Sequence, residues 1–126
     1  MDNYQVGVFP YTEDGKIVLI KTRDGNYWIF PKGHVEKGRK DHAVAEEEAF
    51  EEAGILGKID PHSLCFKTIC SKSKQLCLYP MRVKKVLNKW PESKERERVI
   101  VSVAKAEKLL EKDLRDVLKS MAKKYL

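Results

Sequence analysis

Short runs of hydrophobic residues, separated by turn-forming residues, make up the N-terminal part of the chain. Residues 5–10 and 17–22 have the length and side-chain pattern of strands, and residues 13–15 form a turn signal between them. A second turn signal at residues 23–26 leads into residues 27–30, which predict a further short strand. The chain is therefore expected to begin with paired strands.

A hairpin and one more strand are predicted in the second half of the chain. Residues 63–69 and 75–85 alternate well enough for two antiparallel strands, with a turn at residues 71–74. Pro80 cannot donate a backbone hydrogen bond, so it predicts that its strand lies at an edge of the sheet or contains a bulge. Residues 99–103 predict the last strand.

From residue 104 onward, hydrophobic residues recur at helical spacing, which is typical of a helical face packed on a core. The members of this stripe are Ala106, Leu109, Leu110, Leu114, Val117, Leu118, Met121 and Tyr125. Strands followed by helices in this order indicate an α/β fold with a mixed sheet between helices. The length of 126 residues has room for one core, so a single domain over residues 1–126 is expected.

Composition argues against several classes of protein. No apolar stretch is long enough to cross a bilayer, and the first residues lack the basic region and apolar core of a secretory signal. Cys65, Cys70 and Cys77 are odd in number, and their spacing fits neither a disulfide framework nor a zinc site. We therefore expect free thiols in strands and a cytoplasmic protein.

The formal net charge is +6, although the chain contains a strongly acidic segment. A basic surface raises solubility and attracts anions, and it suits a highly anionic small molecule. Nucleic acid would also be attracted, but no recognition motif accompanies the charge. Neither a membrane nor a nucleic acid is therefore the expected partner.

Five glutamates lie within seven consecutive positions of one predicted helix, residues 41–53. They are Glu46, Glu47, Glu48, Glu51 and Glu52. Asp41 is a candidate N-cap, and Gly54 is a candidate for the left-handed residue that ends the helix. Such charge runs are usually solvent-exposed faces, because like charges on a helix repel each other. The alternative is that a hard divalent cation such as Mg²⁺ compensates them.

Helical geometry divides the five glutamates into unequal groups. At about 100° of rotation per residue, Glu48, Glu51 and Glu52 fall on one third of the helix circumference. Glu46 lies on the far side, and Glu47 lies at the flank. Three carboxylates can therefore converge on one cation, while the other two need another explanation.

The segment from Gly33 to Ile55 resembles the signature of the Nudix hydrolases, G-x5-E-x7-R-E-U-x-E-E-x-G-U, in which U is a bulky aliphatic residue. The resemblance implies a Nudix fold, with a mixed β-sheet sandwiched between helices and a loop-helix-loop active site. It further implies a Mg²⁺ site, with Mn²⁺ as an alternative, formed by Glu48, Glu51, Glu52 and the backbone carbonyl of Lys32. The three glutamates would be catalytic, Glu51 serving either as a third ligand or as a general base.

Two signature positions depart from the family pattern, and they do so together. Arg39 stands where the signature has its first glutamate, and Glu47 stands where it has arginine. In the family these positions resemble an ion pair that ties the loop to the helix. We therefore predict the same ion pair with its charges exchanged, within a structural set that also includes Gly33 and Gly54. A separation of the charged groups above about 4 Å would contradict this.

Residues on either side of the signature point toward phosphate. Residues 28–36 resemble the entry loop of diadenosine-polyphosphate hydrolases and diphosphoinositol-polyphosphate phosphohydrolases, which implies phosphate contacts for Lys32 and His34. Arg96 and Arg98 resemble part of the tail of the latter group and are further candidates. A loop-stabilising histidine and solvent-exposed arginines are the alternatives.

These features predict a metal-dependent pyrophosphohydrolase that cleaves a phosphoanhydride bond in a polyphosphorylated small molecule. Diadenosine polyphosphates are the first candidate substrates, and diphosphoinositol polyphosphates are the second. Hydrolysis of RNA 5′ ends and of damaged nucleoside triphosphates are alternatives within the same class. Because Arg39 and Glu47 depart from the signature, a catalytically silent module that binds a nucleotide also stays open. The sequence predicts neither the cleaved bond nor the oligomeric state.

Overall fold

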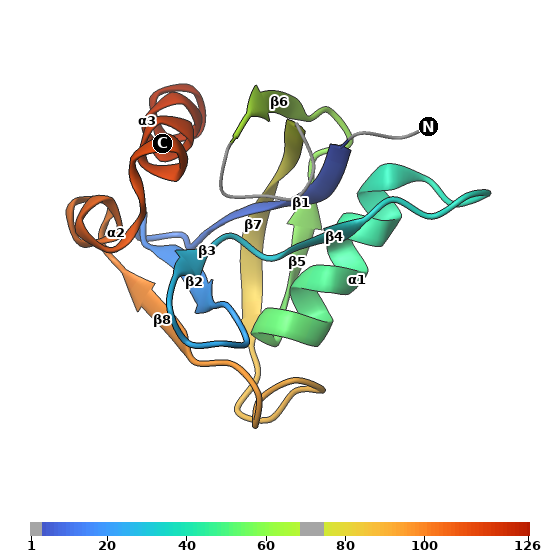
Figure 1. Ribbon diagram of the computed structural model, residues 1–126, viewed down its shortest axis with the longest axis horizontal. Coiled ribbons are helices and arrows are strands. Elements are labelled where there is room, and N and C mark those ends of the chain that lie inside the picture. Colours follow the sequence, from blue (N-terminus) through green and yellow to red (C-terminus); the bar gives the residue numbers. More distant parts are fainter. Residues whose placement is uncertain (1–3, 69–74) are drawn as a thin grey trace.

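In the computed structural model, a mixed β-sheet lies between α1 on one side and α2 and α3 on the other (Figure 1). The structure describes residues 4–68 and 75–126. The strands are β1 (Tyr4–Tyr11), β2 (Ile17–Lys21), β3 (Trp28–Ile29), β4 (Lys32–His34), β5 (Ile55–Ile59), β6 (Leu64–Lys67), β7 (Gln75–Val86) and β8 (Arg98–Val101). The helices are α1 (Asp41–Ala53), α2 (Val103–Leu109) and α3 (Lys112–Tyr125). The predicted α/β fold is confirmed.

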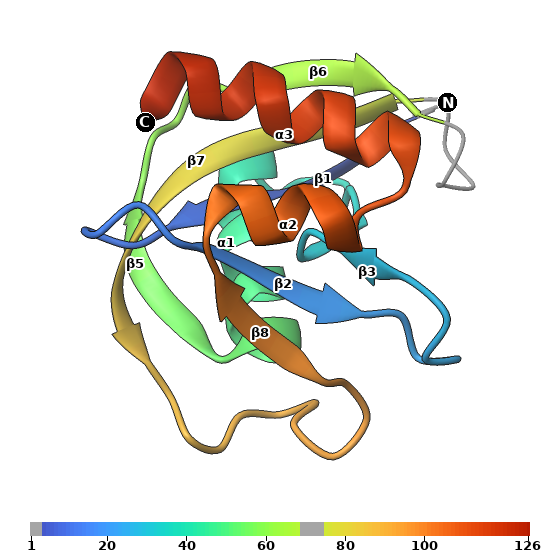
Figure 2. The same ribbon diagram turned by 90° about the vertical axis from the view of Figure 1, so that its left-hand side faces the viewer.

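The sheet is built around one parallel pair of strands. The strand order is β3-β2-β1-β7-β5, and β4 pairs with β1, β6 with β7, and β8 with β2. β1 and β7 are parallel, in register from Tyr4 opposite Gln75 to Tyr11 opposite Arg82. Parallel strands are usually buried on both faces, and β1 is accordingly buried at all six of its interior positions. Figure 2 shows α3 crossing the face of the sheet that lies opposite α1.

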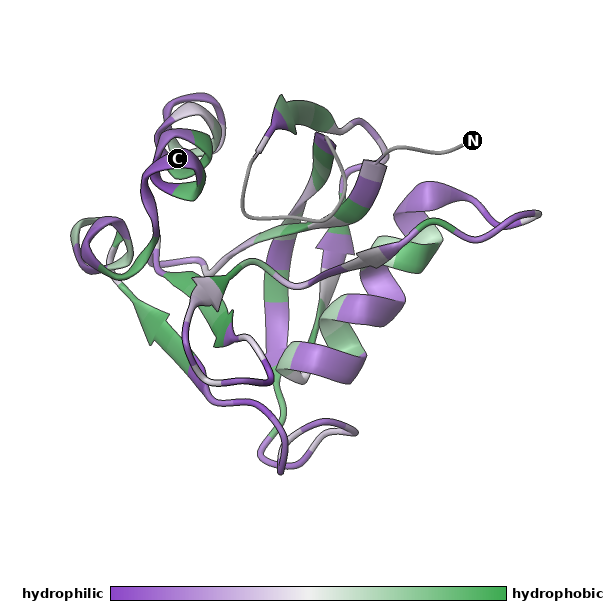
Figure 3. Ribbon diagram, viewed as in Figure 1, coloured by the Kyte–Doolittle hydropathy of each residue, from purple (hydrophilic) through white to green (hydrophobic). Residues whose placement is uncertain are grey.

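The core fills both spaces between the sheet and the helices. β2, β6 and β8 are drawn largely as hydrophobic in Figure 3, whereas α1 is hydrophilic over most of its surface. Small residues on the inner side of α1 (Val44, Ala45, Ala49 and Ala53) are buried, so the helix lies close to the sheet. The predicted C-terminal stripe is divided between α2 and α3, and its members are buried or packed against the core. No helix in the described residues is long and apolar enough to cross a membrane.

Pro80 lies in the middle of the sheet, so the prediction of an edge strand was wrong. β7 has β1 on one side and both β5 and β6 on the other. β6 pairs with residues 75–78 of β7, and β5 pairs with residues 81–86. Pro80 therefore faces the gap between these two partners and only has to accept, which it does from the backbone N–H of Asp60 at 2.9 Å. The other predicted alternative, a bulge, is present, because the pairing of β5 with β7 shifts register between Leu56 and Gly57, although this position lies away from the proline.

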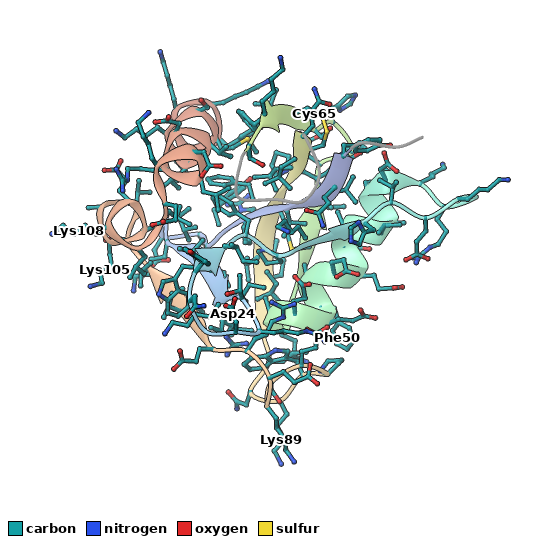
Figure 4. All side chains as sticks on the ribbon, viewed as in Figure 1. Asp24, Phe50, Cys65, Lys89, Lys105 and Lys108 are labelled. Carbon is teal, nitrogen blue, oxygen red and sulfur yellow. A yellow bond between two sulfur atoms is a disulfide. The ribbon has the colours of Figure 1, made fainter. Side chains whose placement is uncertain are left out.

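Cys65 and Cys77 form a disulfide, which contradicts the prediction of free thiols. β6 and β7 pair antiparallel with these two residues directly opposite each other, and their Cα atoms are 3.9 Å apart. Spacing along the chain could not show this, because the register of the hairpin decides which residues face each other. Figure 4 labels Cys65 beside its yellow sulfur atoms. Cys70 and the predicted turn at residues 71–74 lie outside the described residues.

Candidate active site

α1 begins and ends where the sequence predicts, although its N-terminus is not capped as expected. Asp41 is the first helical residue rather than the N-cap; Lys40 occupies the N-cap position without a side-chain cap. The Asp41 carboxylate instead accepts a hydrogen bond from the hydroxyl of Tyr4 on β1, at 2.7 Å. At the other end, Gly54 has a φ of 63° and closes the helix through its N–H, as predicted. Both ends of α1 are thereby defined.

Gly33 lets the loop approach the acidic face of α1. A Cβ atom at this position would lie 2.5 Å from the carboxyl carbon of Glu48, closer than packed atoms tolerate. Gly33 belongs to β4, which is held in place by its antiparallel pairing with β1. The first glycine of the signature is therefore needed for space beside Glu48.

Glu52 is the most perturbed acidic residue in the described part of the chain. Its side chain is 7% exposed. One carboxylate oxygen accepts the backbone N–H of Lys32 at 3.0 Å, and the other lies 3.4 Å from Nη2 of Arg96. Burial raises the pKa of Glu52 to about 8, although both of these contacts act to lower it. The metal-free fold therefore favours a protonated Glu52 at neutral pH.

Glu48 and Glu52 share one hollow, and Glu51 does not belong to it. Burial raises the pKa of Glu48 as well, and its carboxyl group interacts with that of Glu52. Both glutamates line a hollow of about 400 Å³, and Gly33 lines it from β4. The remaining described residues that line it are Gln5, Arg23, Ile29, Lys32, His34, Glu36 and Arg96. Glu51 is partly exposed on the adjoining surface of the helix.

Lys32 contributes both its backbone and its side chain to this site. Val8 N–H donates to the carbonyl of Pro31, so the paired register leaves Lys32 in a position that does not bond to β1. Its backbone polar groups therefore point away from β1, and its N–H reaches Glu52. Its carbonyl is on the same side, where the resemblance implied a ligand. The ammonium group donates to the side-chain oxygen of Gln5 at 2.9 Å.

Arg96 connects the hollow to a second chain of charged residues. Its side chain is 10% exposed, its Nε donates to Glu92 at 2.8 Å, and its Nη1 donates to the carbonyl of Lys21 at 3.1 Å. Glu92 also pairs with Arg23 at 3.3 Å. These contacts hold the Arg96 guanidinium beside Glu52. Arg96 therefore lies in the hollow beside Glu52, and its predicted contact with substrate phosphate stays a prediction.

Arg98 does not line the hollow, and its side chain is engaged at the end of α1, so the geometry gives no support to its predicted contact with substrate phosphate. Its Nη1 donates to the carbonyls of Ala53 at 2.9 Å and Leu87 at 2.8 Å. Its guanidinium carbon lies 4.1 Å from the ring centre of Trp90, whose indole N–H donates to the carbonyl of Glu52 at 2.9 Å. Arg98 thus satisfies the carbonyl of Ala53, which the last turn of α1 leaves without a helical partner. A cation at this end of a helix also interacts favourably with the helix dipole.

Arg39 and Glu47 form the predicted ion pair with exchanged charges. Nη2 of Arg39 lies 3.1 Å from Oε2 of Glu47, and Nη1 lies 3.3 Å from Oε1. The same guanidinium contacts Glu36 at 3.2 Å, within the loop. These hydrogen bonds, with that of Glu47 the strongest, raise the pKa of Arg39. A two-pronged pair of this kind fixes both partners in orientation.

The residues around the hollow fit a hard divalent cation that keeps part of its water shell. Within residues 4–68 and 75–126, no three His, Cys, Asp or Glu side chains are arranged as a complete metal-binding group. Mg²⁺, however, is usually held by only one or two carboxylates, together with waters and substrate phosphates. Glu48, Glu52 and the carbonyl of Lys32 match that requirement. Burial is the main cause of the raised pKa of each glutamate, so a cation bound beside them would favour their charged forms.

Several residues of the hollow were not foreseen from the sequence. Gln5 belongs to β1 and Arg23 to the turn between β2 and β3, while Glu92, which binds Arg96 beside the hollow, belongs to the segment before β8. None of them lies in a recognisable motif. They reach the site because β4 pairs with β1 and because the segment before β8 runs beside Lys21. A sequence pattern could have identified them only through a predicted strand order.

Comparison with known proteins agrees with the geometry. The model of the NUDIX domain matches residues 1–121. Nudix hydrolase 17, mitochondrial, of Arabidopsis thaliana is 34% identical in an alignment of 115 residues that covers 80% of this chain and 63% of that protein. Diphosphoinositol polyphosphate phosphohydrolase 3-beta of Bos taurus is 29% identical over 81 residues, covering 64% of this chain and 49% of that protein. The chain thus spans less than two thirds of the length of these relatives.

Solved structures show the same fold. A C. elegans Ap4A hydrolase matches with a TM-score of 0.69 and 19% identity, over 96% of both chains. A structure from work on the MutT proteins of Aliivibrio salmonicida and Vibrio cholerae matches with a TM-score of 0.68 and 18% identity, over 94% of both chains. At these identities the likeness concerns the fold alone. The match of the domain model over nearly the whole chain, with the signature at the site, shows that the chain belongs to the Nudix family.

Proposed function

We propose that this protein is a metal-dependent pyrophosphohydrolase that cleaves a phosphoanhydride bond in a polyphosphorylated small molecule. The observation that carries the proposal is the pairing of Glu48 and Glu52 in one hollow that cationic side chains also line. When bound, a divalent cation would neutralise phosphate oxygens and lower the pKa of an attacking water. Glu48, Glu52 and the carbonyl of Lys32 would hold that cation.

The cationic side chains have a separate task, which is to position the phosphates. Arg23, Lys32 and Arg96 line the hollow, and Arg96 is held in place by Glu92 and the carbonyl of Lys21. Guanidinium groups bind phosphate with two parallel hydrogen bonds, which fixes orientation as well as charge. His34 lines the same hollow and can donate to a phosphate oxygen. Glu51, beside the hollow, is available as a general base or a further ligand.

Among the candidate substrates we now place diphosphoinositol polyphosphates ahead of the diadenosine polyphosphates that the sequence placed first. No aromatic side chain is among the described residues that line it, so recognition there rests on charge. Relatives named diphosphoinositol polyphosphate phosphohydrolases, in cattle and in rat, are 29% and 30% identical to the chain over 81 residues. Diadenosine polyphosphates are the second candidate, because Tyr27, two residues before Ile29 in the chain, is 50% exposed and offers a ring for a base.

The test is a metal-dependent turnover assay on a panel of substrates. A diphosphoinositol polyphosphate, diadenosine tetraphosphate and triphosphorylated RNA are each incubated with and without Mg²⁺ or Mn²⁺. Glu52→Gln is expected to remove most turnover, since it takes a charged ligand from the site. Glu46→Gln is the matched control, because Glu46 is an exposed glutamate on the same helix. Turnover that survives Glu52→Gln would contradict the proposed site. Tight metal-dependent binding of a substrate without any turnover would favour a catalytically silent module.

A further inference from the structure

A second hollow lies at the opposite end of the central strand. Its smaller part, of about 320 Å³, is lined by residues that include Tyr11, Lys58, Arg82 and Tyr125. A wider part, of about 560 Å³, shares Tyr11, Arg82 and Tyr125 with it, so the two form one groove. Figure 2 shows the end of α3, the turn after β1 and the end of β5 close together at one edge of the molecule.

This groove is separate from the candidate active site. Gln5 lines the active-site hollow and Tyr11 lines the groove, and both belong to β1. Tyr11 lies six positions after Gln5 along the extended strand, which corresponds to about 20 Å. The two lists of lining residues have no member in common. A ligand in the groove would therefore not contact Glu48 or Glu52.

Two cations face each other in the groove without carboxylate partners. Lys58 is directly opposite Arg82 on β5 and β7, and Arg82 is directly opposite Tyr11 on β1. Across the described part of the chain, neither Lys58 nor Arg82 takes part in an ion pair or a side-chain hydrogen bond. Like charges directly opposite each other on paired strands are unfavourable. An anion bound between them would remove this repulsion.

The acidic residues nearby are already engaged or lie farther along the groove. Asp60 accepts the backbone N–H of His62 at 2.9 Å, and Asp14 pairs with Lys16 at 3.7 Å. Asp14 and Glu13 line only the wider part, whereas Lys58 lines only the smaller part. The smaller part therefore holds two cations, Lys58 and Arg82, and one carboxylate, Asp60, and it is the cationic end of the groove.

Aromatic rings stand beside the cationic end. Tyr11 and Tyr125 line both parts of the groove from β1 and α3, and Lys124 lies 5.5 Å from the ring centre of Tyr125. Aromatic side chains bind nucleobases through their flat faces, largely without regard to sequence. Volumes of a few hundred Å³ are typical of sites for small molecules. Rings beside paired cations match a ligand that has both a flat ring and a phosphate.

We propose that this groove binds a mononucleotide, with its phosphate between Lys58 and Arg82 and its base against Tyr11 and Tyr125. The site is independent of the proposed hydrolysis, because it shares neither residues nor metal with the candidate active site. It would give the protein a nucleotide-binding site apart from the site of hydrolysis.

The test uses isotope-labelled full-length chain, with EDTA present to exclude metal-dependent binding, and adenosine 5′-monophosphate as the probe. Nuclear magnetic resonance follows the backbone amides during titration. The amides of Tyr11, Lys58, Arg82 and Tyr125 are expected to shift together with a single dissociation constant. Adenosine and inorganic phosphate, titrated separately, are expected to bind at least about tenfold more weakly, since each can make only one kind of contact.

Matched variants separate the proposed contacts from a general effect of charge. Arg82→Glu and Lys58→Glu are each expected to weaken binding about tenfold or more. Lys108→Glu makes the same change of charge on the outer side of α2 (Figure 4) and is expected to leave the affinity unchanged. Because either reversal in the groove removes a like-charged pair, neither should unfold the protein, and thermal denaturation verifies this.

A third variant tests the aromatic part of the site. Tyr125→Leu is expected to weaken binding of the nucleotide while leaving the weak binding of inorganic phosphate as it was. Three results would overturn the proposal: amide shifts confined to Lys32, Gly33 and His34, equal losses in Arg82→Glu and Lys108→Glu, or phosphate binding as tightly as the nucleotide. Loss of turnover in the substrate assay would have no bearing on it, since no metal or turnover is involved here.

Discussion

Replacing Gly54 by alanine tests how the last turn of α1 is held. Gly54 has a φ of 63°, and a Cβ atom there would lie 2.7 Å from Cδ2 of Trp90. Gly38 is the matched control, because it has a φ of 81° but no atom within 4 Å of a Cβ. Both substitutions place alanine in the left-handed region, but only the Cβ of Gly54→Ala would also overlap with the ring of Trp90.

The expected cost can be built from these two contributions. The left-handed conformation costs an L-residue roughly 1–2 kcal/mol, and this part is common to both variants. Trp90 is held by its hydrogen bond to the carbonyl of Glu52 and by the guanidinium of Arg98, so it cannot move aside freely. Overpacking of this kind costs about 1–3 kcal/mol. Gly54→Ala should therefore lose about 1–3 kcal/mol more stability than Gly38→Ala.

Urea denaturation of both variants and of the wild-type chain measures this difference. Linear extrapolation gives the free energy of unfolding, and equal slopes show that the comparison is valid. In a Trp90→Ala background the excess cost of Gly54→Ala is expected to disappear, which a double-mutant cycle measures. Equal losses for Gly54→Ala and Gly38→Ala in the wild-type background would refute the packing of Trp90 on the end of α1.

Three further predictions concern the acidic helix and its loop. Arg39→Glu should lower the thermal midpoint, while the double reversal with Glu47→Arg should restore most of it; a double variant no better than the single one would contradict the ion pair. Without metal, the pKa of Glu52 is higher in the folded state, about 8, than in the unfolded state, about 4.3. The resulting contribution to stability is complete below about pH 4.3 and is lost as the pH rises toward 8. Glu52→Gln should therefore be the more stable protein at pH 9, by a margin that denaturation in EDTA shows shrinking toward pH 5. Gly33→Ala should displace the Glu48 carboxylate and weaken Mg²⁺ binding in calorimetry, with little loss of stability, since a flexible side chain can yield.

The sequence by itself determined the parts of the site that depend on local spacing. The bounds of α1, the left-handed Gly54 and the pairing of Arg39 with Glu47 were all predicted and are all present. Helical rotation places Glu48 and Glu52 on one side regardless of the rest of the fold, and both line the hollow. Glu51 was placed on the same side but lies outside the hollow, because the loop covers only part of that face.

Only the tertiary structure decided which residues from elsewhere in the chain complete the site. Arg96 and Arg98 are two residues apart, so neither their type nor their spacing distinguishes them. β8 pairs with β2, with Arg98 opposite Ile20, and this leaves Arg96 beside Lys21 and Glu52 while Arg98 stacks on Trp90. The disulfide and the central position of Pro80 depend on strand pairing in the same way. Strand order and register are long-range properties of the whole sheet; hydrophobic periodicity along one strand shows which side faces the core, but it does not show which strand lies beside it.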